Sequence, residues 1–186
     1  LKIIGKVPKC GSAETKVAIN AANDGDSILV HPSQYEENIV ISNKTVYLYN
    51  LYYYTNQYSQ GGSHLRITPS QNNTNTLSIS NNNSEIYGFK FTGSGSGGSS
   101  IVITNGNPVI QHCSFEDNES NNTIMIHSSN PVFKNILFYN HFEHGQHHAF
   151  YWDSNSNPII NNSTIIDFGG TIFNGGDIVN NAIITF

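Results

Sequence analysis

One short pattern recurs along the second half of the chain, and this repeat limits the possible folds more than any other feature. Its copies occupy residues 85–91, 107–115, 130–138, 157–165 and 177–184. In each copy two apolar runs flank a bend residue, namely Gly88, His112, Asn135, Asn162 and Asn181, at intervals of 24, 23, 27 and 19 residues. Repeats of about 20–25 residues with strand-like runs are typical of solenoids, because one unit cannot bury its apolar face alone.

Each repeat is predicted to contain three short strands, two around the bend and one before them. The preceding strand covers residues 77–79, 101–103, 124–126 and 150–152. Side chains alternate along a strand, so the apolar ends of these triplets are expected to point inward. The central residues then point outward: Ser78, Val102, Met125 and Tyr151. At the bends, the repeated Asn can adopt the left-handed conformation and hydrogen-bond to its copy in the next coil.

The composition suits such a stack of coils. Charged residues are only 11% of the 186 residues, whereas 27 residues are Asn. Coils lie about 4.8 Å apart, so like charges at equivalent positions would repel one another. A hydrophobic content of 37% with periodic Ile, Val and Phe disfavours a disordered chain, and the length suggests one domain.

Charge and hydropathy argue against two classes of partner. The net charge of −5, with only eight Lys and Arg, disfavours nucleic acid, and no apolar run approaches the ~20 residues that span a bilayer. No signal-peptide pattern begins at Leu1, so any targeting segment is expected to be absent already. Cys113 occupies an apolar repeat position, which favours a buried free thiol over a bridge to Cys10.

Residues 13–24 form the one convincing helical segment. Val17, Ala18, Ala21 and Ala22 are spaced to share an apolar face, with Ser12 as N-cap and Gly25 at the C-terminal end. Strand-like runs follow at 27–30, 38–41 and 45–49. The first rung of a stack exposes unpaired backbone, so the helix is predicted to cover that end.

Residues 15–49, especially 18–30 and 35–41, resemble the N-terminal cap and first coils of right-handed parallel β-helix proteins of the pectin-lyase-like superfamily. The later Asn-Pro units extend this resemblance over nearly the whole chain. Residues 45–53 look like secreted members from gliding and gut Bacteroidetes, many of them exported by type IX secretion. The sorting domain expected of such cargo is missing, so the chain is expected to be part of a longer protein.

We therefore predict an all-β fold, a single-stranded right-handed parallel β-helix with an N-terminal capping α-helix. One domain is expected over residues 1–186, with the capping helix at 13–24 and about six or seven coils over 27–186.

Two outward rows of side chains are candidates for carbohydrate contact. The row Ser80, Thr104, His127 and Asp153 lies beside the row that ends in Tyr151, and the His-rich segment 141–148 is expected to overhang their last rung. Polar rows with an aromatic platform suit sugars, which present hydroxyls along their edges and C–H groups on their faces. In the superfamily that the chain resembles, polysaccharides commonly lie across one outer face. The candidate residues are His127, His144, His147, Tyr151 and Asp153. An ordinary solvated sheet surface is the alternative.

No cofactor and no metal site are expected. The segment 144–148 lacks the Glu of a helical HExxH zinc motif, although His141, Glu143 and His144 could still meet in a loop.

Catalysis is not expected in this segment. Hydrolases of this fold need paired Asp residues, and none are adjacent here; the single Arg, Arg66, has no Asp partners nearby in the sequence. The alternative is a polysaccharide lyase or other carbohydrate-active enzyme acting on acidic polysaccharide; a lyase would use His127 or His144 as base and Tyr151 as acid. Only Lys90 and Lys134 follow Arg66 to neutralise a substrate carboxylate.

The predicted function is a secreted or cell-surface passenger domain that binds glycan or serves as an adhesive spacer. Its expected partners are a polysaccharide or cell-surface glycan and the secretion machinery, with no nucleic acid and no membrane span. The expected location is extracellular or on the cell surface.

Overall fold

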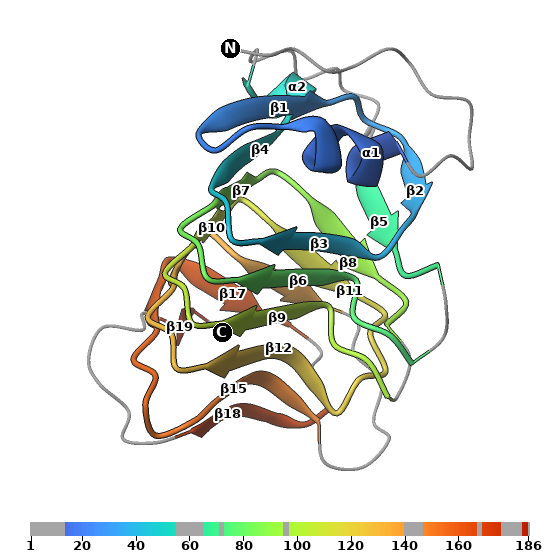
Figure 1. Cartoon of the computed structure of the whole chain (residues 1–186). Helices are drawn as coiled ribbons and strands as arrows, with labels where there is room; N and C mark the ends of the chain where they lie inside the picture. The colour runs from blue at the N-terminus through green and yellow to red at the C-terminus, as the bar shows by residue number, and fades with distance from the viewer. Residues whose placement is uncertain are drawn as a thin grey trace.

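The computed structural model describes residues 14–54, 65–70, 73–94, 97–139, 147–166, 169–175 and 184–185. Three parallel sheets, called A, B and C, run side by side along the molecule (Figure 1). Sheet A contains β1 (Asp26–Val30), β4 (Val46–Asn50), β7 (Glu85–Tyr87), β10 (Val109–Gln111), β13 (Val132–Lys134) and β16 (Ile159–Asn161). Sheet B contains β2 (Gln34–Glu36), β5 (Arg66–Thr68), β8 (Lys90–Thr92), β11 (Ser114–Glu116), β14 (Leu137–Tyr139), β17 (Ser163–Ile165) and β19 (Ile184–Thr185). Sheet C contains β3 (Ile39–Ser42), β6 (Leu77–Ser80), β9 (Ile101–Thr104), β12 (Asn122–His127), β15 (His148–Trp152) and β18 (Thr171–Gly175).

The chain visits sheets A, B and C in turn and then starts the next rung, so each strand pairs with the strand one coil away. Followed from the N-terminal end, the coils wind in the right-handed sense (Figure 1), which is the sense that parallel crossovers strongly favour. The predicted right-handed parallel β-helix is therefore confirmed. The described strands form six successive A–B–C sets, from β1–β2–β3 to β16–β17–β18, with β19 as a further strand of sheet B, which agrees with the six or seven coils expected.

The interior is filled by equivalent side chains stacked on successive rungs. In sheet C the predicted alternation is confirmed: Leu77, Ile101, Ile124 and Phe150 are each 0% exposed. In sheet B, Phe91, Phe115 and Phe138 form a buried stack, with ring centroids 5.3 and 4.8 Å apart. This vertical stacking explains why a repeat can be read from the sequence, because each rung must supply the same kind of side chain at the same place.

The bend between sheets A and B uses the left-handed backbone region, as predicted. The described bend residues have positive φ: Gly88 81°, His112 54°, Asn135 53° and Asn162 49°. The corner between sheets C and A has a second set that the repeat did not reveal, comprising Asn43, Asn81, Asn105 and Ser128. Next to this corner, the side-chain oxygens of Asn83, Asn107 and Asn130 each accept a hydrogen bond from a backbone N–H of the next coil. The abundant Asn therefore serves both corner geometry and coil-to-coil bonding.

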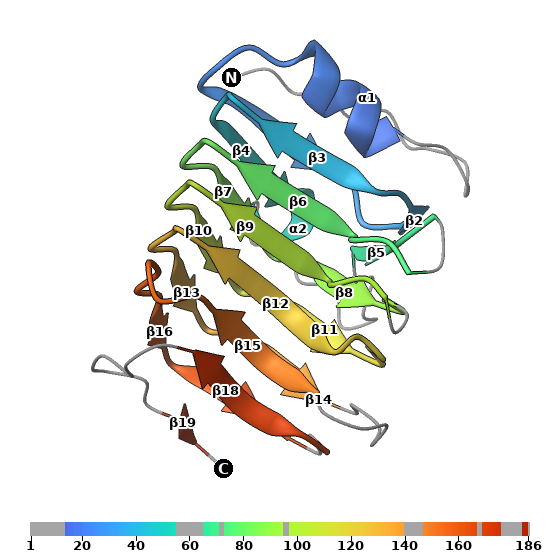
Figure 2. The same cartoon turned by 60° about the horizontal axis from the view of Figure 1, so that its bottom comes forward.

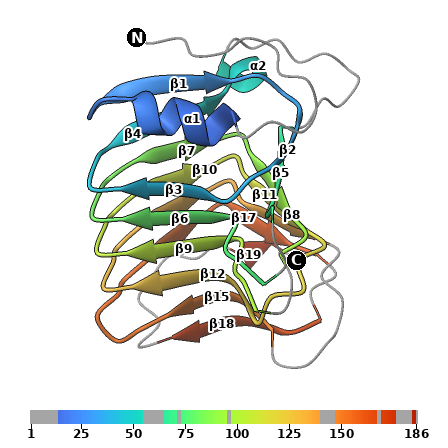
Figure 3. The same cartoon turned by 45° about the vertical axis from the view of Figure 1, so that its right-hand side comes forward.

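Helix α1 (Glu14–Ala21) covers the first rung, as Figures 2 and 3 show. The predicted capping role is confirmed, and the predicted apolar face is right at Ala18 and Ala22 but wrong at Val17 and Ala21, which are exposed. Val17 is 65% exposed, and the face that meets the core is made by Ala18, Ile19 and Ala22, with Thr15 beside them. The true stripe has i, i+3, i+4 and i+7 spacing, and it was missed because Thr15 is polar. The predicted N-cap, Ser12, lies outside the described residues.

Two side chains from the first rungs satisfy the ends of this helix. The carboxylate of Glu37, 2% exposed, accepts hydrogen bonds from the backbone N–H groups of Thr15 (3.1 Å) and Lys16 (2.8 Å). Lys44 Nζ donates to the carbonyls of Ile19 (2.5 Å) and Ala22 (3.1 Å). The opposite charges complement the helix dipole and join the cap to the coils.

Three further features complete the fold. A second short helix, α2 (Leu51–Tyr54), follows β4 and was not predicted from the sequence. Cys113 is buried and free, as predicted, while Cys10 lies outside the described residues. No helix in the part of the chain that the structure describes has the length and apolar character needed to cross a bilayer.

Candidate functional site

The outer face of sheet C carries the two predicted rows of side chains. Register pairs Val40, Ser78, Val102, Met125, Tyr151 and Asn174 on successive rungs, which extends the central row by one residue at each end. The neighbouring row runs Ser42, Ser80, Thr104 and His127 in register, with Asp153 directly after β15. None of these side chains is buried, so both rows face outward as predicted.

Tyr151, His127 and Asp153 come together at the C-terminal part of this face. The rings of His127 and Tyr151 lie 6.2 Å apart at an interplanar angle of 58°. His127 Nδ1 lies 3.4 Å from Asp153 Oδ2, and the two side chains are 36% and 28% exposed. The arrangement places a half-buried aromatic ring beside a polar pair that can both donate and accept hydrogen bonds.

Asp153 is held in place by more than its histidine neighbour. Its carboxylate accepts hydrogen bonds from Ser156 Oγ (2.7 Å) and from the backbone N–H groups of Ser128 and Asn155. Burial acts to raise the pKa of Asp153, but these hydrogen bonds, with that of His127, outweigh it and lower the pKa below its ordinary value. Asp153 is therefore a charged, fixed acceptor.

His148 is a member of this site that the sequence reasoning missed. Its ring lies 6.4 Å from that of Tyr151, on the side of β15 where the strand begins. His148 Nδ1 donates to Asn122 Oδ1 (2.8 Å), and Asn174 Nδ2 donates to His148 Nε2 (2.9 Å), so three successive rungs fix the imidazole. Ala149 and Phe150 both point inward, which breaks the alternation and brings His148 to the outer face with Tyr151. Aligning His148 with Asn122 of the preceding repeat would have revealed this position.

Of the other two predicted histidines, His147 does not join the site and His144 lies outside the described residues. His147 is 5% exposed, and its Nδ1 donates to the carbonyl of Ser120 (2.8 Å), while its buried Nε2 has no partner among the described residues. It points away from the outer face. His141 and Glu143 lie outside the described residues as well, so the place of His144 over the last rung stays a prediction.

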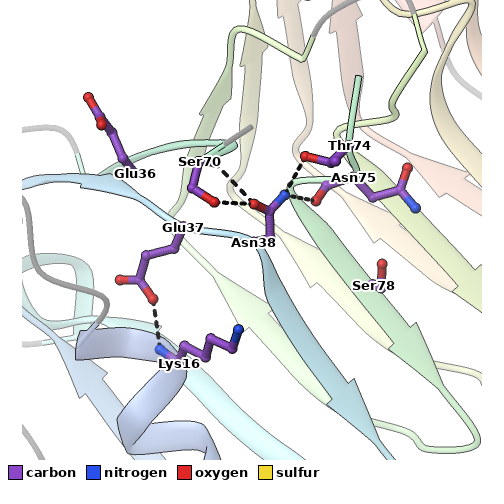
Figure 4. Close-up of a pocket in the computed structure, with 8 residues that line it drawn as sticks. All are labelled: Lys16, Glu36, Glu37, Asn38, Ser70, Thr74, Asn75 and Ser78. Carbon is purple, nitrogen blue, oxygen red and sulfur yellow. Dashed lines mark hydrogen bonds between the residues drawn. The ribbon is translucent and has the colours of Figure 1, made fainter. Parts of the chain in front are cut away.

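A polar pocket of about 460 Å³ lies at the N-terminal end of the same face (Figure 4). Ser78 of the central outward row lines it, together with Lys16 of α1, Glu36 at the end of β2 and Asn38. Asn38 Nδ2 donates to Thr74 Oγ1 (2.8 Å) and to the carbonyl of Asn75 (2.6 Å). Its Oδ1 accepts from Ser70. The pocket therefore combines rigid amide and hydroxyl groups with one exposed ammonium and one exposed carboxylate.

A second charged cluster, also unexpected from the sequence, lies on the outer face of sheet B. Lys90 pairs with Glu116 and sits over the ring of Tyr139, with Nζ 5.3 Å from the ring centroid. Burial opposes ionisation of Glu116, but the hydrogen bond from Lys90 outweighs it and lowers the carboxyl pKa, with a smaller contribution from Arg66. Arg66 is next to Lys90 in register and donates from Nε to Thr92 Oγ1 (2.9 Å). These cations are thus tied to sheet B, away from Tyr151.

Among the described residues, no three His, Cys, Asp or Glu side chains come together as a metal site would require. Comparison with known proteins finds no matching family model, no matching curated protein and no matching solved structure.

Proposed function

We propose that this solenoid is a glycan-binding module, with the outer face of sheet C as its binding surface. The observation that carries the proposal is the Tyr151 ring, flanked by His127 and His148 and followed by the fixed carboxylate of Asp153. A pyranose can stack its C–H face on the tyrosine while its hydroxyls donate to Asp153 and exchange hydrogen bonds with the imidazoles. Because these four side chains belong to adjacent strands or strand ends, they are positioned before the ligand binds.

The length of the face suits a polymer better than a single sugar. Tyr151 lies three rungs from Ser78, which lines the polar pocket, and rungs about 4.8 Å apart make this span roughly 14 Å. Val102 and Met125 occupy the positions between them. An extended glycan would therefore reach from the tyrosine platform to the pocket, making hydrogen bonds at both ends and apolar contacts between.

We further propose that the chain is a member of the pectin-lyase-like superfamily and acts outside the cell or on its surface as an exported protein. The right-handed parallel coils, the helical cap over the first rung and the left-handed Asn bends support this assignment. Export by type IX secretion is the proposed route, on the resemblance of residues 45–53 alone.

A second candidate function is a polysaccharide lyase. The His127–Asp153 pair favours it, since a carboxylate on Nδ1 orients an imidazole to take a proton at Nε2, and Tyr151 stands within reach as an acid. Abstraction of a proton beside a uronate carboxylate also needs a positive group to neutralise that carboxylate. Lys90 is paired with Glu116 on sheet B and Lys134 lies on sheet A, and the described outward rows of sheet C hold no Lys or Arg. Binding is therefore the better-supported function.

A glycan array with the wild-type protein and the double variant Tyr151→Ala/Asp153→Ala tests the first proposal. We expect binding to at least one glycan to fall at least tenfold in the double variant, because the stacking platform and the fixed acceptor are both removed. Tyr139→Ala is the matched control, since it removes a half-buried tyrosine from sheet B and should leave glycan binding unchanged. Equal binding by the wild type and the double variant would refute the assignment of this face.

The lyase alternative is tested by incubating the protein with polygalacturonate and following the ultraviolet absorbance of the unsaturated product. A rise in absorbance that His127→Gln abolishes would favour catalysis instead.

A further inference from the structure

The outer face of sheet A carries a group of four aromatic rings that the function proposed above does not use. Tyr47 and Tyr49 project from β4, Tyr87 from β7 and His112 from the bend after β10, and all four are half-buried. Ring centroids are 6.4 Å apart for Tyr47 and Tyr49, 6.2 Å for Tyr49 and Tyr87, and 4.8 Å for Tyr87 and His112. The group, called here the sheet A aromatic row, follows the solenoid axis over three successive rungs.

Polar groups are interleaved with these rings. Glu85 Oε2 accepts a hydrogen bond from the hydroxyl of Tyr49 (3.2 Å), and Glu85 Oε1 accepts one from Gln111 Nε2. Asn135 Nδ2 donates to His112 Nε2 (3.2 Å). Tyr49 and His112 are thus held in place by hydrogen bonds between coils, and their polar partners lie at the same surface.

The fold itself does not require rings at these positions. The register of sheet A places Val109, Val132 and Ile159 on later rungs in line with Tyr47 and Glu85. In line with Tyr49 and Tyr87 it places Gln111, Lys134 and Asn161. The strands of these later rungs still pair in register, although their outward side chains are aliphatic or polar rather than aromatic. Outward rings confined to one part of a sheet therefore indicate a surface for contact, as tyrosine contributes a large, rigid apolar area with few rotatable bonds.

We propose that the sheet A aromatic row is a second carbohydrate-binding surface and that it takes a chain of uncharged sugars. The rise between rungs, about 4.8 Å, is close to the length of one pyranose unit in an extended chain, so successive sugars can meet successive rungs. Each sugar offers a C–H face to a ring and hydroxyls to Glu85, Gln111 and Asn135.

The charge beside the tyrosine rings selects against acidic sugars, although Lys134 lies one rung beyond Gln111 on the same face. Glu85 is the one charged side chain among the outward residues of β4, β7 and β10, and its carboxylate would repel a uronate. A neutral sugar hydroxyl can instead donate to either of its oxygens. Since sheets A and C face different directions around the coil (Figure 2), the two surfaces can hold two separate glycan chains. The proposal is independent of glycan binding by sheet C.

Binding of neutral hexasaccharides tests this surface. Cellohexaose, xylohexaose and mannohexaose are the probes, hexagalacturonate is the charged comparison, and ligand-observed NMR titration gives affinities. We expect at least one neutral probe to bind, and Tyr49→Ala/Tyr87→Ala to weaken it at least about tenfold, since two stacked rings are lost. Tyr49→Phe/Tyr87→Phe, which keeps both rings, should retain most of the affinity. Tyr151→Ala/Asp153→Ala should leave this binding unchanged while reducing binding at sheet C, so the two proposals fail separately.

A second measurement on the wild-type protein removes any dependence on variant folding. Tyrosine nitration by tetranitromethane, mapped by mass spectrometry, should be reduced at Tyr47, Tyr49 and Tyr87 when the bound hexasaccharide is present, with Tyr139 as the internal control. Failure of all three neutral probes to bind, equal affinity for the alanine double variant, or unchanged nitration of the three tyrosines would each overturn the proposal.

Discussion

Replacing Phe115 with alanine tests the stacked interior directly. Phe115 is 0% exposed, and its ring lies nearly parallel to those of Phe91 and Phe138, at interplanar angles of 16° on both sides. Truncation removes the buried ring and leaves a cavity between two rungs, which costs about 3–5 kcal/mol. Loss of both ring contacts places the expected decrease in the free energy of unfolding near the upper end of that range.

Equilibrium unfolding in urea, followed by circular dichroism, measures this decrease, and a thermal scan provides a second reading. A loss of about 4 kcal/mol corresponds to a fall in Tm of about 8–16 °C for a domain of this size. Phe173→Ala is the matched control, because Phe173 lies on β18 and is only partly buried against the core. Its truncation is expected to cost roughly 1–2 kcal/mol. A loss below about 1 kcal/mol for Phe115→Ala, or one no larger than that for Phe173→Ala, would refute a sealed stack of rungs.

Two further predictions concern single residues. Burial raises the pKa of the Cys113 thiol to about 12, so in a Cys10→Ser background the native protein should resist a thiol reagent at pH 8 that labels the urea-unfolded protein at once. The folded state then keeps a proton that the unfolded state releases above the ordinary pKa of 9.0, so this thiol should lower the unfolding free energy by up to about 1.4 kcal/mol per pH unit above pH 9. Cys113→Ala should make the pH dependence of unfolding shallower by that amount, and an unchanged slope would contradict the assignment. Asn135 has φ 53°, so Asn135→Gly should be close to neutral, whereas Asn135→Val should lower the urea midpoint by the equivalent of about 1–2 kcal/mol; equal midpoints would contradict a left-handed bend.

Most of the fold was predictable because each rung repeats the same inward apolar side chains and the same bend. A pattern that recurs several times in the sequence predicted the alternation of buried and outward side chains in β6, β9 and β12. The same pattern predicted the bends at His112 and Asn135. The helix was predicted in its place, yet its buried face was wrong at Val17. The capping helix occurs only once among the elements predicted from the sequence, so its pattern could not be compared with a second copy. Which of its faces is buried depends on where the first rung lies.

The candidate site was predictable in part for the same reason. Tyr151, His127 and Asp153 lie where the alternation put them, whereas His147 turns inward and His148 outward because the alternation breaks at Ala149. The Lys90–Glu116–Tyr139 cluster and the sheet A aromatic row join residues from three coils. Their members share no sequence pattern, since outward positions are free to vary from rung to rung.

The sequence alone determined the architecture, because burying an apolar strip in a stack of short rungs demands the same inward side chains at regular intervals. Only the tertiary structure decided which outward residues meet, because that depends on register between coils separated by more than 20 residues. The hydrogen bonds of Glu37 with the start of α1 likewise depend on the tertiary structure, because Thr15 and Lys16 are 22 and 21 residues away from Glu37 in the sequence.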